Sequence, residues 1–235
     1  MSDYKYDYVL DKNGPKGVSV ESWLENNKLA LIIIDIQNYI TNRKYRGKYS
    51  SDGADDYYYN RLENTVLPNI LKIIKRFREH GIKIVYTRIA SQSKRLEDVP
   101  GLGRKYLADK NNLDEDGKRW TLYCDEHSSE VDKRIEPLPE DIVIMKTGSG
   151  AFSSSEIDLI LRNNNISRLV FTGGLTDACI SSTVRGAFDR GYLCTIVEDA
   201  CITSTEVDHE AALRSLDKFY GWVTSTEDLL SRLYK

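Results

Sequence analysis

Two charged residues and a cysteine stand close to apolar runs, where their side chains could do chemistry. Asp35 directly follows the run 29–34, and Lys146 directly follows the run 142–145. A buried carboxylate or ammonium group needs a partner, because an unpaired charge is costly to bury. Cys179 lies a few residues beyond a third apolar run. A thiol, a carboxylate and a cation brought together would form a nucleophile with its activating groups.

The sequence around Cys179 indicates how its thiol could be activated. It reads Gly173-Gly174-Leu175-Thr176-Asp177-Ala178-Cys179. The two glycines allow a sharp turn with exposed amides, and Thr176 or Asp177 could cap a following helix. The sequence thus predicts Cys179 in the first turn of a helix. There the helix dipole and free amides lower the pKa of a thiol, and the amides could hold an oxyanion.

Each of these residues has a simpler explanation when it is taken alone. Asp35 could be a helix cap or part of a salt bridge, and Lys146 a surface lysine that extends its ammonium group to solvent. A lone Cys179 could be a small buried apolar residue. The three other cysteines lack this setting. Cys194 is expected in a strand as a core residue, and neither Cys124, in a polar loop, nor Cys201, near a turn after Asp199, has a visible activator.

The elements that must position these residues are strands alternating with helices. Continuous apolar runs indicate strands that are buried on both faces, as in a parallel sheet. Such runs occupy 29–34, 82–86, 142–145, 169–171, 194–197 and 222–224, with helical patterns between most of them. This order predicts an α/β fold with a parallel sheet covered on both faces. Since parallel strands end at one edge of the sheet, Asp35, Lys146 and Cys179 should meet there.

Length and composition predict one domain with an arm. The chain has 235 residues, of which 40% are hydrophobic, enough for one sizeable core. Residues 1–28 lack a clear period and are expected to form an N-terminal arm, followed by the domain 29–235. The long segments 41–60 and 88–140 interrupt the alternation and are candidate lids or contacts between subunits. We expect a homo-oligomer, a dimer or tetramer, with the tyrosines 57–59 as one candidate interface.

The charge balance and the cysteine and histidine counts exclude several classes of function. Lys and Arg number 33 against 36 Asp and Glu, a net charge of −3, which gives no electrostatic reason to expect nucleic acid or an anionic membrane as partner. No apolar run is long enough to span a bilayer, and the first residues are too polar for a secretion signal. Four cysteines without a CxxC pair and three scattered histidines predict no disulfide framework and no metal or other cofactor. A cytoplasmic location is expected.

Three motifs in this order resemble those of the isochorismatase-like cysteine hydrolases. They are Leu31-Ile32-Ile33-Ile34-Asp35-Ile36-Gln37-Asn38-Tyr39, Lys146-Thr147-Gly148-Ser149-Gly150-Ala151-Phe152, and the segment 173–179 continuing to Tyr192. The resemblance covers residues 29–225. It implies a three-layer α/β/α sandwich, Rossmann-like, on a six-stranded parallel sheet.

The resemblance also implies a role for each site residue. Cys179 would be the nucleophile, and Asp35 would take the thiol proton and return it to the leaving nitrogen. Lys146 would hold this pair and favour the thiolate. The bond between Gly174 and Leu175 would be a cis peptide, and the amides of Leu175 and Cys179 would form the oxyanion hole. The reaction would release ammonia or an amine and leave a thioester that water cleaves.

This sequence differs from the motifs of particular branches of the family. These differences narrow the range of expected substrates. True isochorismatases lack the nucleophilic cysteine, and nicotinamidases carry histidines of a metal site in a region where residues 41–79 hold none. The Cys179 motif resembles most the ureide hydrolases, such as biuret, ureidoacrylate and N-carbamoylsarcosine hydrolases. A small ureide or carboxamide is therefore the expected substrate. In the family, the motif that begins at Lys146 commonly ends in Ser-Ala-Phe. Here Gly150 stands in place of the serine, so the serine hydroxyl is missing.

Four residues are candidates for binding this substrate. A planar amide suits aromatic walls with a few polar groups, for which we select Gln37, Trp120 and Phe152. Arg88 could grip a substrate carboxylate in a bidentate manner. For Arg88 and Trp120 the alternative is a lid contact or a subunit interface.

Three other functions remain open from the sequence. One is ether hydrolysis of the isochorismatase type, which would use Asp35 without the thiol. Another is a non-catalytic binding member of the same fold. A third is a thiol redox sensor, which needs a resolving cysteine close to Cys179 and leaves Asp35 and Lys146 unexplained.

Overall fold

A single parallel sheet of six strands forms the centre of the molecule. The computed structural model describes residues 26–45, 54–101 and 112–233, together with 10–11, 14–15 and 24. The sheet has the strand order β5-β4-β3-β6-β7-β8, and every neighbouring pair is parallel. Its strands are β3 (Leu29–Ile34), β4 (Lys83–Ile89), β5 (Ile142–Lys146), β6 (Arg168–Gly174), β7 (Leu193–Ile202) and β8 (Trp222–Thr224). A separate pair, β1 (Leu10–Asp11) and β2 (Gly14–Pro15), is antiparallel.

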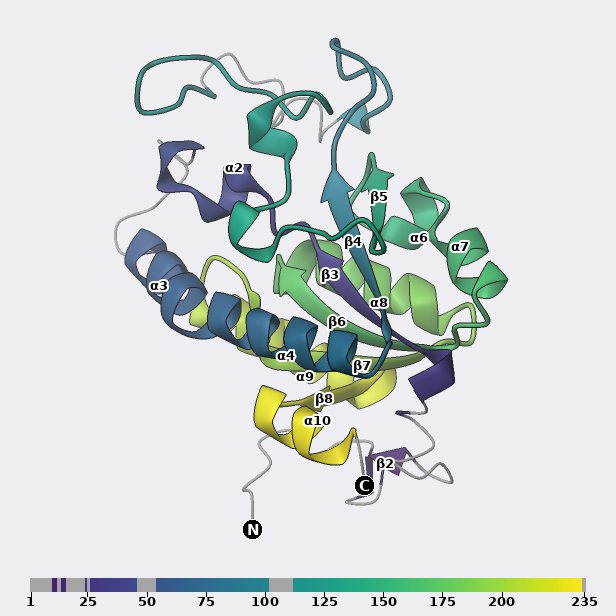
Figure 1. The fold of residues 1–235 in the computed structure, drawn as a ribbon. Coiled ribbons are helices and arrows are strands. Elements are labelled where there is room, and N and C mark those ends of the chain that lie inside the picture. Colours follow the sequence, from purple (N-terminus) through teal and green to yellow (C-terminus); the bar gives the residue numbers. More distant parts are fainter. Residues whose placement is uncertain are drawn as a thin grey trace.

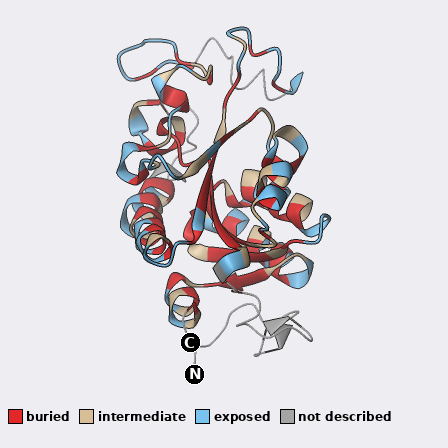
Figure 2. Cartoon of the chain, turned by 45° about the vertical axis from the view of Figure 1, so that its right-hand side comes forward, coloured by how far each residue is buried: buried red, intermediate tan, exposed pale blue. Residues whose placement is uncertain are grey.

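Strand β3 shows why the apolar runs form a buried parallel sheet. All six of its side chains are buried, and Figure 2 shows the strands of the sheet mostly in the colour of buried residues. Leu31 and Ile33 belong to the core on one face, and Ile32 and Ile34 to the core on the other. Alternate side chains of a strand point to opposite faces, so only an unbroken apolar run can fill both cores. The parallel three-layer fold predicted from the sequence is confirmed.

Helices cover both faces of the sheet (Figure 1). One face is covered by α3 (Ala54–Arg61), α4 (Leu67–Glu79) and α10 (Thr226–Arg232). The other is covered by α6 (Ala151–Ser154), α7 (Ile157–Asn163), α8 (Ser181–Phe188) and α9 (Glu206–Phe219). A π-helical turn, Leu62–Val66, joins α3 to α4, and Pro68 is the second residue of α4. In the first turn of a helix, proline's missing N–H donor is readily accommodated.

Helix α3 corrects one expectation from the sequence. The tyrosines 57–59 were a candidate subunit interface, but Tyr58 and Tyr59 are buried inside the chain's own core. Their rings meet edge to face with centroids 5.2 Å apart. Consecutive side chains of a helix point in different directions, so the three tyrosines cannot all face the same way. Two of them face the core. An oligomeric assembly itself stays a prediction.

The long segments lie beyond the carboxyl ends of the strands. Figure 1 shows the chain after β4 beyond the carboxyl end of that strand, with α2 (Asn38–Thr41) to one side, and then shows it returning past the sheet to the start of β5. There Trp120 packs against Tyr45 and Leu122 in a small separate core. A role as a lid stays a prediction, and residues 46–53 and 102–111 of the expected lids lie outside the described residues. So does most of the expected arm.

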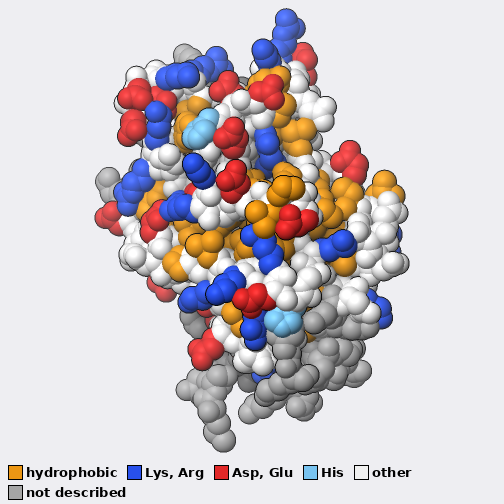
Figure 3. All heavy atoms as spheres, viewed as in Figure 1, with side chains coloured by type: hydrophobic (Ala, Val, Ile, Leu, Met, Phe, Trp, Pro, Cys, Tyr) orange, Lys and Arg blue, Asp and Glu red, His pale blue; other side chains and the backbone are white. Residues whose placement is uncertain are grey.

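The surface in Figure 3 carries acidic and basic side chains in mixed positions. This pattern fits the small net charge of −3. Within the described part of the chain, no helix is long and apolar enough to cross a membrane.

Candidate active site

Asp35 reaches the site through an unusual backbone conformation. A regular continuation of β3 would direct Asp35 to the same face as Ile33, the face covered by α4. Instead Asp35 has a φ of 51°, in the left-handed region, which aspartate adopts more readily than most residues. Its carboxylate therefore meets groups of the opposite face: Oδ1 accepts a hydrogen bond from Thr87 Oγ1 at 2.8 Å. The carboxylate is held inside the protein with only 1% of the residue exposed.

Lys146 is fully buried at the end of β5, between the other two residues of the expected triad. Its Nζ lies 2.7 Å from Asp35 Oδ2, 3.4 Å from Cys179 Sγ and 2.8 Å from the Gly148 carbonyl oxygen. Burial disfavours the charged form, but the charges of Asp35 and Cys179 outweigh this and raise the pKa of Lys146. The side chain is therefore a fixed cation beside the thiol, not a lysine that reaches to solvent.

Two glycines bring the Cys179 turn close to the sheet. Gly173 has a φ of 114°, and a Cβ there would lie 2.1 Å from the Ile34 carbonyl oxygen. A Cβ at Gly174 would lie 2.9 Å from Cγ2 of Ile202. The peptide bond between Gly174 and Leu175 is cis, and the π-helical turn Thr176–Ile180 follows. The glycines thus let β6 end in tight contact with both neighbouring strands, and place Cys179 next to Lys146.

The environment of the Cys179 thiol differs from the sequence-based expectation. Burial, followed by the charge of Asp35, raises the pKa of the thiol to about 12, although Lys146 and a hydrogen bond from Ser149 act in the opposite direction. The expected lowering by a helix N-terminus is therefore wrong. Desolvation and a nearby carboxylate outweigh the amides of a short turn.

The predicted helix cap is also wrong. The π-helical turn has Leu175 at its N-cap and no side-chain cap bond. Thr176 Oγ1 instead lies 2.9 Å from His209 Nδ1, and Asp177 accepts a hydrogen bond from Thr203 Oγ1. Both side chains thus bind the turn to segments of the chain that follow β7.

Gln37 and Arg88 hold the end of β4 to the segment that lies over it. Gln37 is fully buried: its amide group donates to the carbonyls of Ile89 and Ser129, and it accepts a hydrogen bond from the Ile89 amide. Arg88 donates to the Cys124 carbonyl and to Ser129 Oγ. These contacts give both side chains a positioning role, and substrate binding by them stays a prediction.

Trp120 and Phe152 lie in separate apolar clusters. Trp120 is 7% exposed, and its ring centroid lies 5.8 Å from that of Tyr45 and 6.0 Å from that of Tyr39. Phe152 is 6% exposed and packs against Tyr192 in the core beneath α6, with ring centroids 5.4 Å apart. The structure thus gives each ring an internal packing role. Contact with a substrate stays a prediction for both.

The remaining cysteines are not arranged as nucleophiles. Cys194 and Cys201 are buried in β7, and burial raises the pKa of each thiol. The turn expected near Cys201 is part of this strand, which extends to Ile202. Cys124 lies in the polar loop predicted for it, where its thiol lies 3.6 Å from Asp125 Oδ1.

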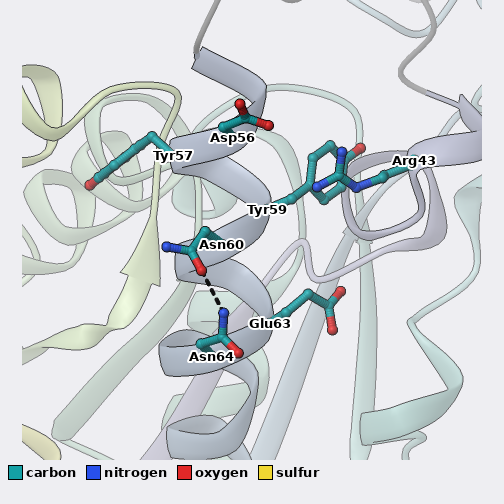
Figure 4. Close-up of a pocket in the computed structure, with 7 residues that line it drawn as sticks. All are labelled: Arg43, Asp56, Tyr57, Tyr59, Asn60, Glu63 and Asn64. Atoms are coloured by element: carbon teal, nitrogen blue, oxygen red, sulfur yellow. Dashed lines mark hydrogen bonds between the residues drawn. The ribbon is translucent and has the colours of Figure 1, made fainter.

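A pocket of about 570 Å³ lies away from this site, along α3 and the π-helical turn that follows it (Figure 4). At the edge of the pocket, the Arg43 guanidinium stacks over the ring of Tyr59. The Asn64 side chain donates a hydrogen bond to the Asn60 side chain along the helix. The pocket is lined by Arg43, Asp56, Tyr57, Tyr59, Asn60, Glu63 and Asn64. None of these belongs to the cluster around Cys179. Across 26–45, 54–101 and 112–233, no group of three His, Cys, Asp or Glu side chains could hold a metal ion.

Sequence reasoning missed four residues around the site. Thr87 could have been found, because it lies two positions after Val85 in the same strand and so faces the same side. Ser149 lies three residues after Lys146, but nothing in this segment of the sequence directs its hydroxyl toward Cys179. Arg61 and His209 lie on helices distant in sequence, and no spacing connects them to the site.

Known proteins share both the fold and the sequence pattern of this chain. A cysteine hydrolase from Pseudomonas syringae pv. phaseolicola 1448A has the same fold, with a TM-score of 0.71 and 17% identity over 89% of this chain and 93% of that one. N-carbamoylsarcosine amidase from Thermoplasma acidophilum gives a TM-score of 0.63 and 23% identity over 85% and 97%. Residues 29–228 match the model of the isochorismatase domain. The chain belongs to the isochorismatase family.

Curated sequences add relatives with a named activity. Ureidoacrylate amidohydrolase RutB of Cronobacter sakazakii is 30% identical over 217 residues, 87% of this chain and 88% of that protein. RutB of Acinetobacter baylyi is 28% identical over 214 residues, 88% of this chain and 84% of that protein.

Proposed function

We propose that this protein hydrolyses a C–N bond of a small ureide or carboxamide, with Cys179 as the nucleophile and a thioester as the intermediate. The observation that carries the proposal is the position of Lys146, whose Nζ contacts both Asp35 Oδ2 and Cys179 Sγ. A carboxylate, a buried cation and a thiol in mutual contact provide a base, a stabilising charge and a nucleophile. The names of the RutB relatives and of N-carbamoylsarcosine amidase support the substrate class.

Proton transfer to Asp35 starts the proposed reaction. Because the pKa of the Cys179 thiol is raised, the thiol needs a base when it attacks. Asp35 accepts the thiol proton, and the Lys146 cation stabilises the thiolate that forms. The sulfur then bonds to the substrate carbonyl carbon, whose oxygen gains the negative charge. When the C–N bond breaks, the proton held by Asp35 moves to the leaving nitrogen, which departs as ammonia or an amine.

Water completes the reaction through the same groups. Asp35 is ionised again after the first step and accepts a proton from the water that attacks the thioester carbonyl. The C–S bond breaks, and the proton returns to the Cys179 sulfur. The amides of Leu175 and Cys179 stabilise the oxyanion in both steps. Two backbone N–H groups at such a turn are the usual donors for this charge.

Two other functions predict different behaviour. Ether hydrolysis of the isochorismatase type needs Asp35 and not the thiol, and a binding protein needs neither. The contact between Lys146 and the sulfur favours the thiol mechanism, because neither alternative makes use of it.

The proposal is tested by ammonia release from a panel of small amides. The panel contains biuret, ureidoacrylate, N-carbamoyl amino acids, nicotinamide and simple carboxamides, with isochorismate followed by its own product. The wild type is compared with Cys179→Ser, and Cys124→Ser is the control for loss of a cysteine away from the cluster. We expect release that Cys179→Ser abolishes and Cys124→Ser retains. Isochorismate conversion that survives in Cys179→Ser, without any ammonia release, would show ether hydrolysis instead.

A further inference from the structure

A buried histidine lies behind the Cys179 turn and takes no part in the chemistry proposed above. His209, on α9, is 2% exposed, and Thr176 at the start of the turn is fully buried. His209 Nδ1 lies 2.9 Å from Thr176 Oγ1, and His209 Nε2 lies 2.9 Å from Nη2 of Arg61 on α3. A chain of side-chain contacts therefore connects α3, α9 and the nucleophile turn.

The chemistry of arginine decides how the protons of this chain are arranged. A guanidinium group is always protonated and can only donate hydrogen bonds. His209 Nε2 must therefore accept from Arg61. The ring is neutral with its proton on Nδ1, and this N–H donates to Thr176 Oγ1. The oxygen of the Thr176 hydroxyl thus accepts a hydrogen bond from His209 Nδ1.

Arg61 holds the same turn through the sheet as well. Its Nε donates to the Cys201 carbonyl at 3.2 Å, and Nη2 donates to the Glu198 carbonyl at 2.8 Å. Cys201 is paired in register with Gly173, and the next residue of β7 is paired with Gly174, directly after a register shift between the two strands. Arg61 therefore supports the end of β6 on one side, and through His209 it supports Thr176 on the other.

The supported segment contains the amides of the proposed oxyanion hole. Leu175 lies between the paired Gly174 and the anchored Thr176. Its carbonyl accepts hydrogen bonds from the amides of Ala178 and Ile180. A rotation of the backbone at Thr176 would change the direction of the neighbouring amides, whereas Asp35 and Lys146 come from other strands and would keep their places. Oxyanion donors act only when they are aimed at the developing charge.

We propose that His209 is a positioning residue, which aims the oxyanion amides through its hydrogen bond to Thr176 and is itself held by Arg61. This inference rests on the function proposed above. It separates two properties of the site: the reactivity of the thiol depends on Asp35 and Lys146, and stabilisation of the oxyanion depends on His209 and Thr176.

Matched substitutions distinguish the two ends of the histidine. In His209→Asn the side-chain amide can replace the Nδ1 donor, and in His209→Gln the side-chain oxygen can replace the Nε2 acceptor. Thr176→Val removes the acceptor with almost no change of shape, and Thr176→Ser retains it. We expect Thr176→Val and His209→Gln to lower kcat about 10- to 100-fold, as misaimed oxyanion donors do, with KM within about threefold. Thr176→Ser and His209→Asn should recover most of that loss.

The rate at which iodoacetamide alkylates Cys179 distinguishes the proposed role from a general distortion of the site. A general distortion would change this rate. The rate should stay within about threefold of the wild type in all four variants, because a thiolate needs no oxyanion hole. A parallel fall of kcat and alkylation in both Thr176→Val and His209→Gln would overturn the inference in favour of a merely structural role. So would a Thr176→Val variant with the kcat of the wild type.

A spectroscopic measurement tests the contact independently of activity. In protein labelled with 15N in its histidines, the signals lost in His209→Gln identify His209. We expect a neutral ring with the proton on Nδ1; a proton on Nε2 would overturn the arrangement. If the wild type releases no ammonia, the proposed function fails and the catalytic part of the inference fails with it. An active wild type with an unaffected Thr176→Val variant overturns the inference alone.

Discussion

The Nζ of Lys146 lies 2.7 Å from Oδ2 of Asp35, and neither side chain is more than 1% exposed. Two buried charges in contact compensate each other, and removal of one leaves the other without its counter-charge. The pair therefore stabilises the fold only as a pair, while its cation also contacts the Cys179 sulfur. Stability and catalysis are coupled at this contact.

Lys146→Met should damage both properties. The substitution leaves the Asp35 carboxylate buried without its cation, which costs about 3–5 kcal/mol of unfolding free energy. It also removes the charge that favours the Cys179 thiolate, so hydrolysis should be lost. Chemical denaturation and ammonia release measure the two effects. Lys83→Met, an exposed position at the start of β4, is the control and should change unfolding by less than about 0.5 kcal/mol. Equal stability of the two variants would contradict the account.

Asp35→Asn should separate thiol reactivity from hydrolysis. The charge of Asp35 raises the pKa of Cys179, so its removal lowers that pKa and increases alkylation at pH 7. Hydrolysis should fall by about 10²–10⁴, because the general base is gone. Alkylation rates across pH and ammonia release are measured on the same samples, with Asp228→Asn on α10 as a control. An Asp35→Asn thiol that reacts more slowly than the wild type would show that we have the sign of the interaction wrong.

Ser149→Ala should shift the reactivity of Cys179 in the opposite direction. Ser149 Oγ lies 3.8 Å from Cys179 Sγ and 3.3 Å from Ser182 Oγ, and its hydrogen bond lowers the pKa of the thiol. Without this donor the alkylation profile should move to higher pH, with a rate about three- to fivefold lower at a given pH. Ser153→Ala is the matched control, since that hydroxyl donates to the Gly150 carbonyl. Identical profiles for the two variants would exclude a role for Ser149.

Gly173→Ala should be far more damaging than Gly191→Ala. Both glycines have a positive φ, 114° and 82°, but a Cβ at Gly173 would lie 2.1 Å from the Ile34 carbonyl oxygen, and a Cβ at Gly191 meets nothing within 4 Å. Gly191→Ala should cost about 1–2 kcal/mol of unfolding free energy from the backbone conformation alone. Gly173→Ala must also move β3 or β6, so its cost should exceed that value and activity should fall with it. Denaturation curves give the comparison, which fails if the two costs are equal.

The parallel sheet could be predicted because its physical signal is local. Six mainly apolar runs indicate the strands of a parallel sheet, of which β3 is buried on both faces. The ends of parallel strands bring Asp35, Lys146 and Cys179 to one edge. The backbone conformation at Asp35 could not be predicted in this way. Strand periodicity directs that carboxylate to the wrong face, and a positive φ at one residue corrects it.

The electrostatics of Cys179 depended on contacts that the sequence does not contain. A cysteine near a helix N-terminus predicts a lowered thiol pKa, but burial and the distance to Asp35 decide the sign. The same holds for Gln37 and Arg88, whose residue types suit a substrate. Gln37 bonds to Ile89 and Ser129, and Arg88 to the Cys124 carbonyl and Ser129. No spacing in the sequence connects these partners to them.

The most direct test of the central claim is a mass measurement on protein quenched during turnover of the best amide from the panel. We predict an adduct with the mass of the substrate's acyl part, carried by the peptide that contains Cys179 and absent in Cys179→Ser. Ammonia release that continues unchanged in Cys179→Ser, with no adduct on any peptide of the wild type, would contradict a thioester mechanism at this residue.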